Sequence, residues 1–234
     1  MSKWDILCLT QPSRERFLRR LSAVLRPQLA DYSEVQFISR IFDRSLDLGT
    51  NRQRMLEASS AEWTSFIDDD DLVPANYVST IFPLLNDVDY IGFRLQYYHD
   101  GVKQKPTFHS LRYPEWNADQ DGFYRDLSHV NPIRRALALQ VPMSGGAGED
   151  HRWADALRKK NIVRTEHFID SVMYFYFFRS HKEDLPSAPS AQIRLEGIGF
   201  TGQTQTHCPK CGSSSCSLAG GMMNCNQCNA RWSQ

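Results

Sequence analysis

Four consecutive aspartates, Asp68 to Asp71, follow an apolar run that begins at Trp63. Adjacent carboxylates repel one another, so a folded domain that keeps them together needs compensating positive charge. Mg²⁺ or Mn²⁺ would compensate them, because hard divalent cations prefer oxygen ligands. Such carboxylates at the carboxyl end of a strand suit the binding of a metal-chelated diphosphate. The alternative is a solvated acidic turn that caps the next helix.

A second acidic pair, Glu149 and Asp150, follows the glycine-rich stretch 144–148 and opens a predicted helix. A carboxylate in such a place can take the proton of a hydroxyl group as that oxygen attacks a substrate. Both residues are therefore catalytic candidates. The alternative is helix capping, because acidic residues are favoured in the first turn of any helix.

The last 27 residues contain two Cys-x-x-Cys pairs separated by 13 residues. Each pair places two thiolates on one tight turn, and two pairs complete a tetrahedral Zn²⁺ site. The predicted ligands are Cys208, Cys211, Cys225 and Cys228. Four thiolates close the coordination shell, so we expect a structural zinc ion. The spacing leaves Cys216 out of this site.

Composition and length limit the possible classes of protein. The chain has 234 residues and no net charge, so no global field attracts nucleic acid or a membrane. No secretion signal is visible, and the longest apolar run, 172–178, is too short to cross a bilayer. We expect a cytoplasmic protein with no membrane partner. A Pro-, Ser- and Gly-rich linker, 186–206, is expected to separate a domain at 1–185 from a zinc ribbon at 207–234.

Strand-like and helix-like segments alternate along the larger domain, which predicts a mainly parallel sheet flanked by helices. The predicted strands cover 4–10, 35–41, 63–67, 89–98 and 169–178. The predicted helices cover 13–29, 52–59, 131–139 and 149–160, with another that has Pro74 in its first turn. Residues 104–126 lack periodicity and are expected to form a loop or short strands over an active site.

Three segments in this order resemble the family 2 glycosyltransferases of GT-A fold, over roughly Trp4 to His181. Residues 49–58, running into 63–71, are similar to the family's Gly-x-x-Arg-Asn helix and Asp-x-Asp strand end. Residues 89–93 form the second segment. Residues 131–135, followed by 148–150, are similar to the acceptor-side segment that ends in a Glu-Asp pair. The resemblance implies a GT-A-like domain, a nucleotide-diphospho-sugar donor and catalytic Mn²⁺ or Mg²⁺.

The resemblance also implies roles for individual residues. Asp68 would face the nucleotide or donor sugar, Asp70 would bind the metal with Asp68, and Asp150 would be the base. Asp69 and Asp71 would support these groups or cap the next helix. Further contacts with the donor are expected from Thr10, Asp43, Arg52, Asp69 and Arg179. His181 is expected as one further metal ligand.

The chain departs from the family pattern at several of these positions. Thr10-Gln11-Pro12 replaces the usual Thr-x-Asn turn, and the acidic turn that normally surrounds a residue such as Asp43 is missing. For Arg52 and His181 the alternative is an exposed, solvated side chain. His129 either lines the acceptor site or is a structural histidine. Three aromatic residues either stack on a sugar or pack in the core: Trp116, Tyr124 and Trp153.

The sequence thus predicts a metal-dependent glycosyltransferase that acts, with inversion, on a soluble, macromolecular acceptor, a protein or a nucleic acid. The ribbon offers a docking element, although its net charge of about +2 from residue 186 onward is weak for phosphate binding. One alternative is a nucleotidyltransferase, but the glycine-rich phosphate loop is missing after the first strand. The other is a non-catalytic adaptor that binds a nucleotide sugar or a partner.

The two metal sites are expected to be independent. Purified protein should contain one zinc ion per chain, and the Asp70→Ala variant should retain it, while Cys208→Ser should lose it. Elemental analysis after gel filtration measures the zinc content. Loss of zinc from Asp70→Ala would contradict the separation of the two sites.

Overall fold

The computed structural model describes residues 2–180, 216–219, 222–225 and 231–232. The chain divides into two compact units, residues 1–193 and 194–234. The predicted linker and His181, Cys208, Cys211 and Cys228 lie outside the described residues, as do both predicted domain boundaries. The domain limits and the zinc site therefore stay predictions.

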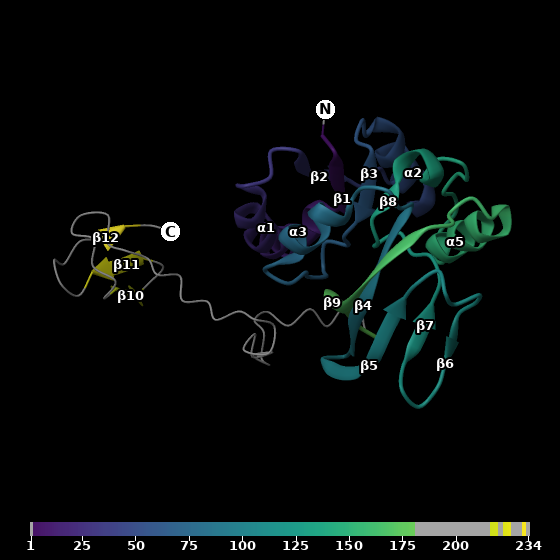
Figure 1. The fold of residues 1–234 in the computed structure, drawn as a ribbon. Coiled ribbons are helices and arrows are strands. Elements are labelled where there is room, and N and C mark those ends of the chain that lie inside the picture. The colour runs from purple at the N-terminus through teal and green to yellow at the C-terminus, as the bar shows by residue number, and fades with distance from the viewer. Residues whose placement is uncertain (1, 181–215, 220–221, 226–230, 233–234) are drawn as a thin grey trace. The chain divides into compact units, whose positions relative to one another are not determined.

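Three parallel strands form the amino-terminal half of the main sheet, in the order β2-β1-β3. They are β1 (Trp4–Thr10), β2 (Val35–Ile41) and β3 (Trp63–Phe66). Between them run a 3₁₀ turn η1 (Pro12–Arg14), α1 (Glu15–Leu29) and α2 (Leu48–Ala58). Strand β2 lies on one side of β1 and β3 on the other. The connection from β1 to β2 and the connection from β2 to β3 therefore run in opposite directions across the sheet. Right-handed connections therefore place α1 and α2 on opposite faces of the sheet (Figure 1).

The other half of the sheet is mixed. The short strand β8 (Ile133–Arg134) lies antiparallel between β3 and β4 (Tyr90–His99). Strand β4 pairs in parallel with β9 (Glu166–Phe178) and forms an antiparallel hairpin with β5 (Val102–His109). Asp100 and Gly101 form the turn of this hairpin, with positive φ at both residues. Strands β7 (Phe123–Arg125) and β6 (Asn117–Ala118) complete the sheet.

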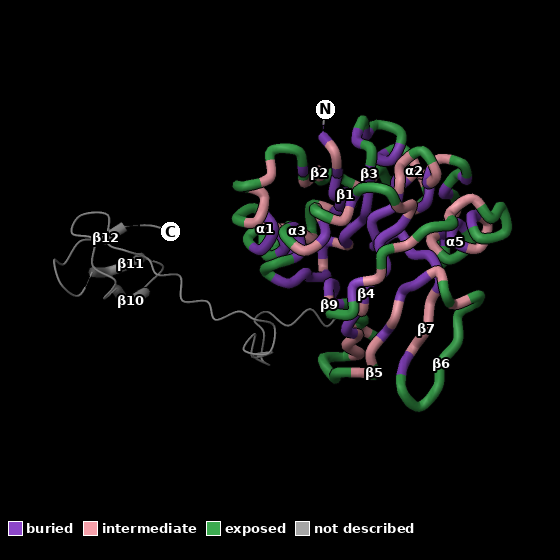
Figure 2. Tube along the Cα trace, viewed as in Figure 1, coloured by how far each residue is buried: buried purple, intermediate pink, exposed green. Residues whose placement is uncertain are grey.

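Helices cover both faces of the sheet (Figure 1). On one face, α1 packs against α3 (Tyr77–Ile81), which is followed by the 3₁₀ turn η2 (Phe82–Leu84), and the rings of Trp4 and Tyr77 lie 5.5 Å apart. On the other face, α2 packs against α5 (Glu149–Lys160), and the core there includes Leu56, Phe66 and Trp153. Figure 2 shows that buried residues follow the central strands, whereas the tip of the β6–β7 hairpin is exposed. The α/β sheet flanked by helices is thus confirmed.

Two predicted helices differ in the structure. Residues 131–139 form strand β8 and only one helical turn, α4 (Arg135–Ala138), because Ile133 and Arg134 pair with β3 and Ile133 also pairs with β4. Pro74 precedes α3 instead of lying in its first turn. Residues 104–126 contain β6, β7 and most of β5, so the expectation of short strands there is correct.

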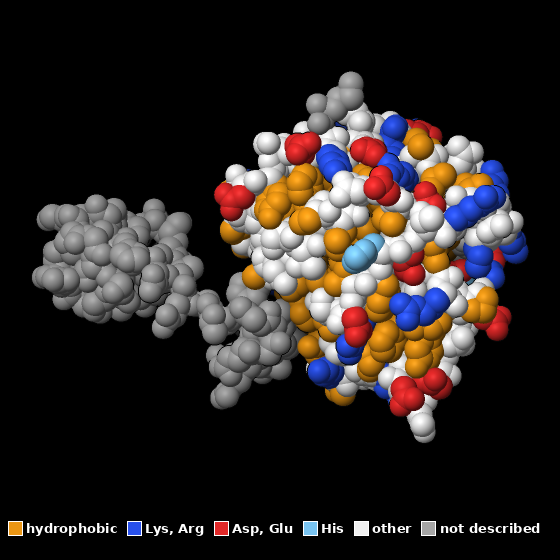
Figure 3. Space-filling view, in the orientation of Figure 1, with side chains coloured by type: hydrophobic (Ala, Val, Ile, Leu, Met, Phe, Trp, Pro, Cys, Tyr) orange, Lys and Arg blue, Asp and Glu red, His pale blue; other side chains and the backbone are white. Residues whose placement is uncertain are grey.

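Strands β10 (Cys216–Ala219), β11 (Met222–Cys225) and β12 (Arg231–Trp232) form a separate antiparallel sheet in the second unit. In the described part of the chain, we find no helix with the length and hydropathy that a bilayer crossing demands. Figure 3 shows acidic and basic side chains interspersed on one face of the main unit, with hydrophobic side chains gathered over β5 and β7.

A glycine in α2 fixes the loop that leads into α5. The Gly49 amide donates to the Gly145 carbonyl over 2.9 Å, and the Asp47 carboxylate accepts from the Gly145 amide over 2.9 Å. A Cβ atom on Gly49 would lie 2.5 Å from the backbone nitrogen of Ser144. Only a residue without a side chain therefore allows this approach.

We expect Gly49→Ala to lower the free energy of unfolding by about 1–3 kcal/mol, because the Cβ must displace backbone. The matched control is Gly146→Ala, where a Cβ meets no atom within 4 Å. That variant should stay within about 0.5 kcal/mol of the parent protein. Urea unfolding measures both, and equal values for the two variants would contradict the close contact.

Candidate active site

The four aspartates form a tight turn immediately beyond β3. The Asp71 amide donates to the Asp68 carbonyl over 3.0 Å, and this hydrogen bond closes the turn. Asp69 and Asp71 are buried, whereas the side chains of Asp68 and Asp70 are 33% and 23% exposed. The turn therefore presents alternate carboxylates to solvent, and these are the two assigned to the donor and metal.

Asp71 anchors the turn to β9. Its carboxylate accepts from the Tyr174 hydroxyl and from the Phe177 amide, each over 2.8 Å. The Tyr174 oxygen in turn accepts from the Asp68 amide over 3.1 Å. Burial, followed by the charges of Asp68 and Asp70, raises the pKa of Asp71 well above its ordinary value. Asp71 is therefore a structural residue that fixes the turn.

Asp69 and Asp70 are held by residues from β1, η1 and the end of β9. The Thr10 hydroxyl donates to Asp69 over 2.7 Å, and Arg14 Nε donates to Asp69 over 2.9 Å. Arg14 also lies 2.8 Å from Asp70, and Arg179 lies 3.3 Å from the other oxygen of Asp70. The expected donor contacts Thr10 and Asp69 thus bind each other, while Arg179 meets the expected metal ligand.

Arg52 joins the two acidic motifs. Its buried guanidinium forms ion pairs with Asp68, over 2.6 Å, and with Glu149. Burial alone would lower the pKa of Arg52, but the two carboxylates outweigh it and raise that pKa. Burial likewise opposes the charge of Asp68, and Arg52 holds the pKa of Asp68 well below its usual range. Arg52 is therefore a buried, charged bridge and not an exposed helix residue.

Asp150 is the open member of the Glu-Asp pair. Its side chain is 31% exposed, whereas Glu149 is buried against Arg52. His129 lies between Asp150 and Asp68, with Nδ1 3.5 Å from an Asp150 oxygen and Nε2 3.9 Å from an Asp68 oxygen. These contacts lack hydrogen-bond geometry, so neither imidazole nitrogen has a hydrogen-bond partner in the described structure.

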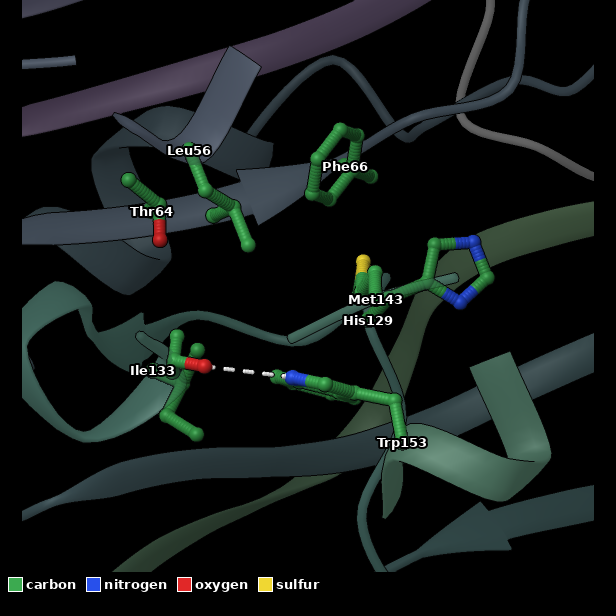
Figure 4. Close-up of a pocket in the computed structure, with 8 residues that line it drawn as sticks. Leu56, Thr64, Phe66, His129, Ile133, Met143 and Trp153 are labelled. Carbon is green, nitrogen blue, oxygen red and sulfur yellow. Dashed lines mark hydrogen bonds between the residues drawn. The ribbon is translucent and has the colours of Figure 1, made fainter. Parts of the chain in front are cut away.

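His129 also lines a small pocket between β3, α4 and α5 (Figure 4). Apolar side chains that include Phe66, Met143 and Trp153 line it, and it has no room for a water molecule. The Trp153 indole donates to the Ala138 carbonyl over 3.2 Å, as Figure 4 shows. Trp153 is therefore a core residue, which leaves the more exposed Trp116 as an aromatic side chain at the surface.

Asp43 lies outside this set of contacts. It follows β2 in an exposed turn, where its carboxylate accepts from the Ser45 amide and hydroxyl and pairs with Arg54 over 3.6 Å. These hydrogen bonds lower its pKa. Asp43 does share the carboxyl edge of the sheet with Thr10, whose carbonyl accepts from the Phe42 amide over 2.8 Å.

Arginine side chains supply positive charge to the aspartate cluster. Arg14, Arg52 and Arg179 face the carboxylates of Asp68, Asp69 and Asp70. Within the ranges that the structure describes, no group of three or more His, Cys, Asp or Glu side chains converges as a metal site. The carboxylates of Asp68 and Asp70 still fit as metal ligands. Mg²⁺ is often held by one or two carboxylates together with substrate phosphates.

Sequence reasoning missed Arg14 and Tyr174 and left the role of His129 open. Arg14 had one available signal: it is a basic residue directly after the first strand, where a phosphate loop was sought. Tyr174 and His129 had none, because their contacts with the aspartates are separated by about 60–106 positions in sequence.

Comparison with known proteins identifies the fold. No protein-family model matches the chain, and no curated protein does. The solved structure of S. aureus TarS 1–349 is similar, with a TM-score of 0.53 and 13% identity over 75% of this chain and 60% of that one. The same fragment in complex with UDP-GlcNAc gives 0.53 and 14%, over 84% and 64%. The chain thus spans less than two thirds of these structures. The likeness confirms the GT-A glycosyltransferase fold expected from the sequence.

Removal of the Arg52 bridge should destabilise the protein strongly. Arg52→Met leaves the buried Glu149 carboxylate without a partner, so we expect a loss of about 3–5 kcal/mol in the free energy of unfolding. The control is Arg54→Met on the same helix, where the exposed pair with Asp43 should contribute at most about 1 kcal/mol. Chemical denaturation measures both values. A loss below about 1 kcal/mol for Arg52→Met would show that the bridge is not needed.

Proposed function

We propose that the chain is a metal-dependent glycosyltransferase that uses a nucleotide-diphospho-sugar donor and inverts the anomeric centre. The observation that carries the proposal is the Arg52 bridge. It ties the aspartate turn, the proposed donor side, to the helix that presents Asp150, the proposed base. The GT-A fold shared with TarS, which has been solved with UDP and with UDP-GlcNAc, supports a nucleotide-sugar donor.

Asp68 and Asp70 are the proposed donor-side residues, because they are the two partly exposed carboxylates of the turn. They would hold Mn²⁺ or Mg²⁺ with the donor phosphates, and such an ion neutralises negative charge that develops on the leaving diphosphate. The protein itself fixes the turn through Asp71 and Tyr174. It also supplies Arg14 and Arg179, whose guanidinium groups match phosphate geometry. In the structure, both arginines pair with Asp70.

Asp150 is the proposed general base. The acceptor O–H bond breaks and the proton passes to the Asp150 carboxylate, while the acceptor oxygen forms a bond to the anomeric carbon. The bond from that carbon to the diphosphate oxygen breaks, and its electron pair leaves with the nucleoside diphosphate. Attack from the face opposite the leaving group inverts the centre. Glu149 does not compete for this role, because Arg52 holds its carboxylate.

The acceptor is proposed to be a soluble macromolecule, a protein or a nucleic acid, engaged through the carboxyl-terminal cysteine module. This step rests on the sequence of residues 207–234 alone. A non-catalytic adaptor would not need an open carboxylate at Asp150 beside the aspartate turn, so the geometry favours the enzyme.

A donor screen tests the function. Purified protein is incubated with Mn²⁺ and each of the common UDP-, GDP-, TDP- and CMP-linked sugars, and nucleotide release by slow hydrolysis is followed. We expect one donor to be turned over, in a reaction that stops when the metal is chelated. Asp70→Asn and Asp150→Asn should each lower the rate at least about 100-fold, since each removes a group that acts on the reacting bonds.

The matched control is Asp155→Asn, on the same helix as Asp150 but paired with Arg158 and Lys159. This variant should keep the parental rate. Turnover that survives Asp150→Asn unchanged would overturn the assignment of the base. Failure of folded protein to bind or turn over any donor would favour the adaptor.

A further inference from the structure

A cluster of four arginines surrounds one phenylalanine ring at the start of α1. The guanidinium carbons of Arg14, Arg16, Arg20 and Arg179 lie 5.3, 4.8, 5.7 and 5.2 Å from the centroid of Phe17. Phe17 itself is buried, whereas Arg16 and Arg20 are exposed. The negative face of the ring attracts each cation, but one ring cannot neutralise four charges.

Two of the four guanidinium groups have no carboxylate partner among the described residues. Arg14 pairs with Asp69 and Asp70, and Arg179 also pairs with Asp70. In the part of the chain that the structure describes, no carboxylate lies within 4.0 Å of Arg16 or Arg20. Both sit in the first two turns of α1, where the positive end of the helix dipole disfavours cations.

Arg20 places one of these charges next to the aspartate turn. Its guanidinium lies over Phe17 and 5.5 Å from the centroid of Phe177, and it donates to the Asp70 carbonyl. A bound anion would offset the repulsion between the guanidinium groups.

We propose that Arg14, Arg16, Arg20 and Arg179 form a phosphate-binding subsite beside Asp70. Guanidinium forks match phosphate oxygens in geometry and charge. The cluster is accessible to solvent at Arg16 and Arg20, and the buried ring of Phe17 forms its base. The proposal deepens the proposed function and rests on it in one respect: the phosphate belongs to a substrate, either the donor diphosphate or a phosphate group on the acceptor.

Calorimetric titration with inorganic pyrophosphate, without added metal, tests the subsite. Relative to the parent protein, Arg16→Gln and Arg20→Gln should each weaken pyrophosphate binding at least about fivefold, and Arg20→Lys should recover part of the loss. The matched control is Arg19→Gln, which lies on the same helix but pairs with Glu15 away from Phe17. Its affinity should equal that of the parent. Thermal melting verifies that every variant is folded.

The source of the phosphate follows from titrating pyrophosphate in the presence of saturating UDP. Competition assigns the subsite to the donor diphosphate, and simultaneous binding assigns it to a phosphate on the acceptor, so both results support a phosphate subsite. Equal pyrophosphate affinity in Arg16→Gln, Arg20→Gln and Arg19→Gln, or no binding to the parent, would overturn it. Pyrophosphate binding without turnover of any donor would instead reject the proposed function and leave the subsite standing.

Discussion

The buried guanidinium of Arg52 is the interaction on which the arrangement of the site depends. It lies between Asp68, on the turn after β3, and Glu149, at the start of α5. A buried charge of this kind is tolerated only when its partners remain in place. If the two acidic motifs separated, Arg52 would lose an ion pair with one of them, and a charged side chain would be left without its partner. The bridge sets where α5, and with it Asp150, lies relative to the aspartate turn.

Further contacts away from Arg52 support the same geometry. Gly49 allows the 144–145 segment to approach α2, and Asp47 accepts from the Gly145 amide. Tyr174 on β9 holds Asp68 and Asp71 together through one hydroxyl group. Three elements that are distant in sequence thus converge on the carboxyl edge of β3, where open α/β sheets bind ligands.

Local patterns allowed the sequence to predict much of this arrangement. The predicted strand at 35–41 and the predicted helix at 149–160 match β2 and α5, because strand-forming residues and an amphipathic helix carry their signal in their own residues. Strand β8 could not be found in this way, since two residues become a strand only through pairing with β3. The Arg52–Glu149 pair spans 97 positions. Both residues were identified individually, but only the tertiary structure shows that they bind each other.

The four aspartates show why residue type alone did not fix the roles. Arg52 lowers the pKa of Asp68, so this carboxylate stabilises the fold above its ordinary value of 3.8, and that stability is lost as the pH falls. Burial raises the pKa of Asp71, so its contribution is complete below 3.8 and is lost as the pH rises through the higher value. Identical neighbours thus have opposite electrostatic effects. The sequence predicted an acidic cluster that needs compensation, but which carboxylate is left for a ligand depends on where β1, α2 and β9 place their partners.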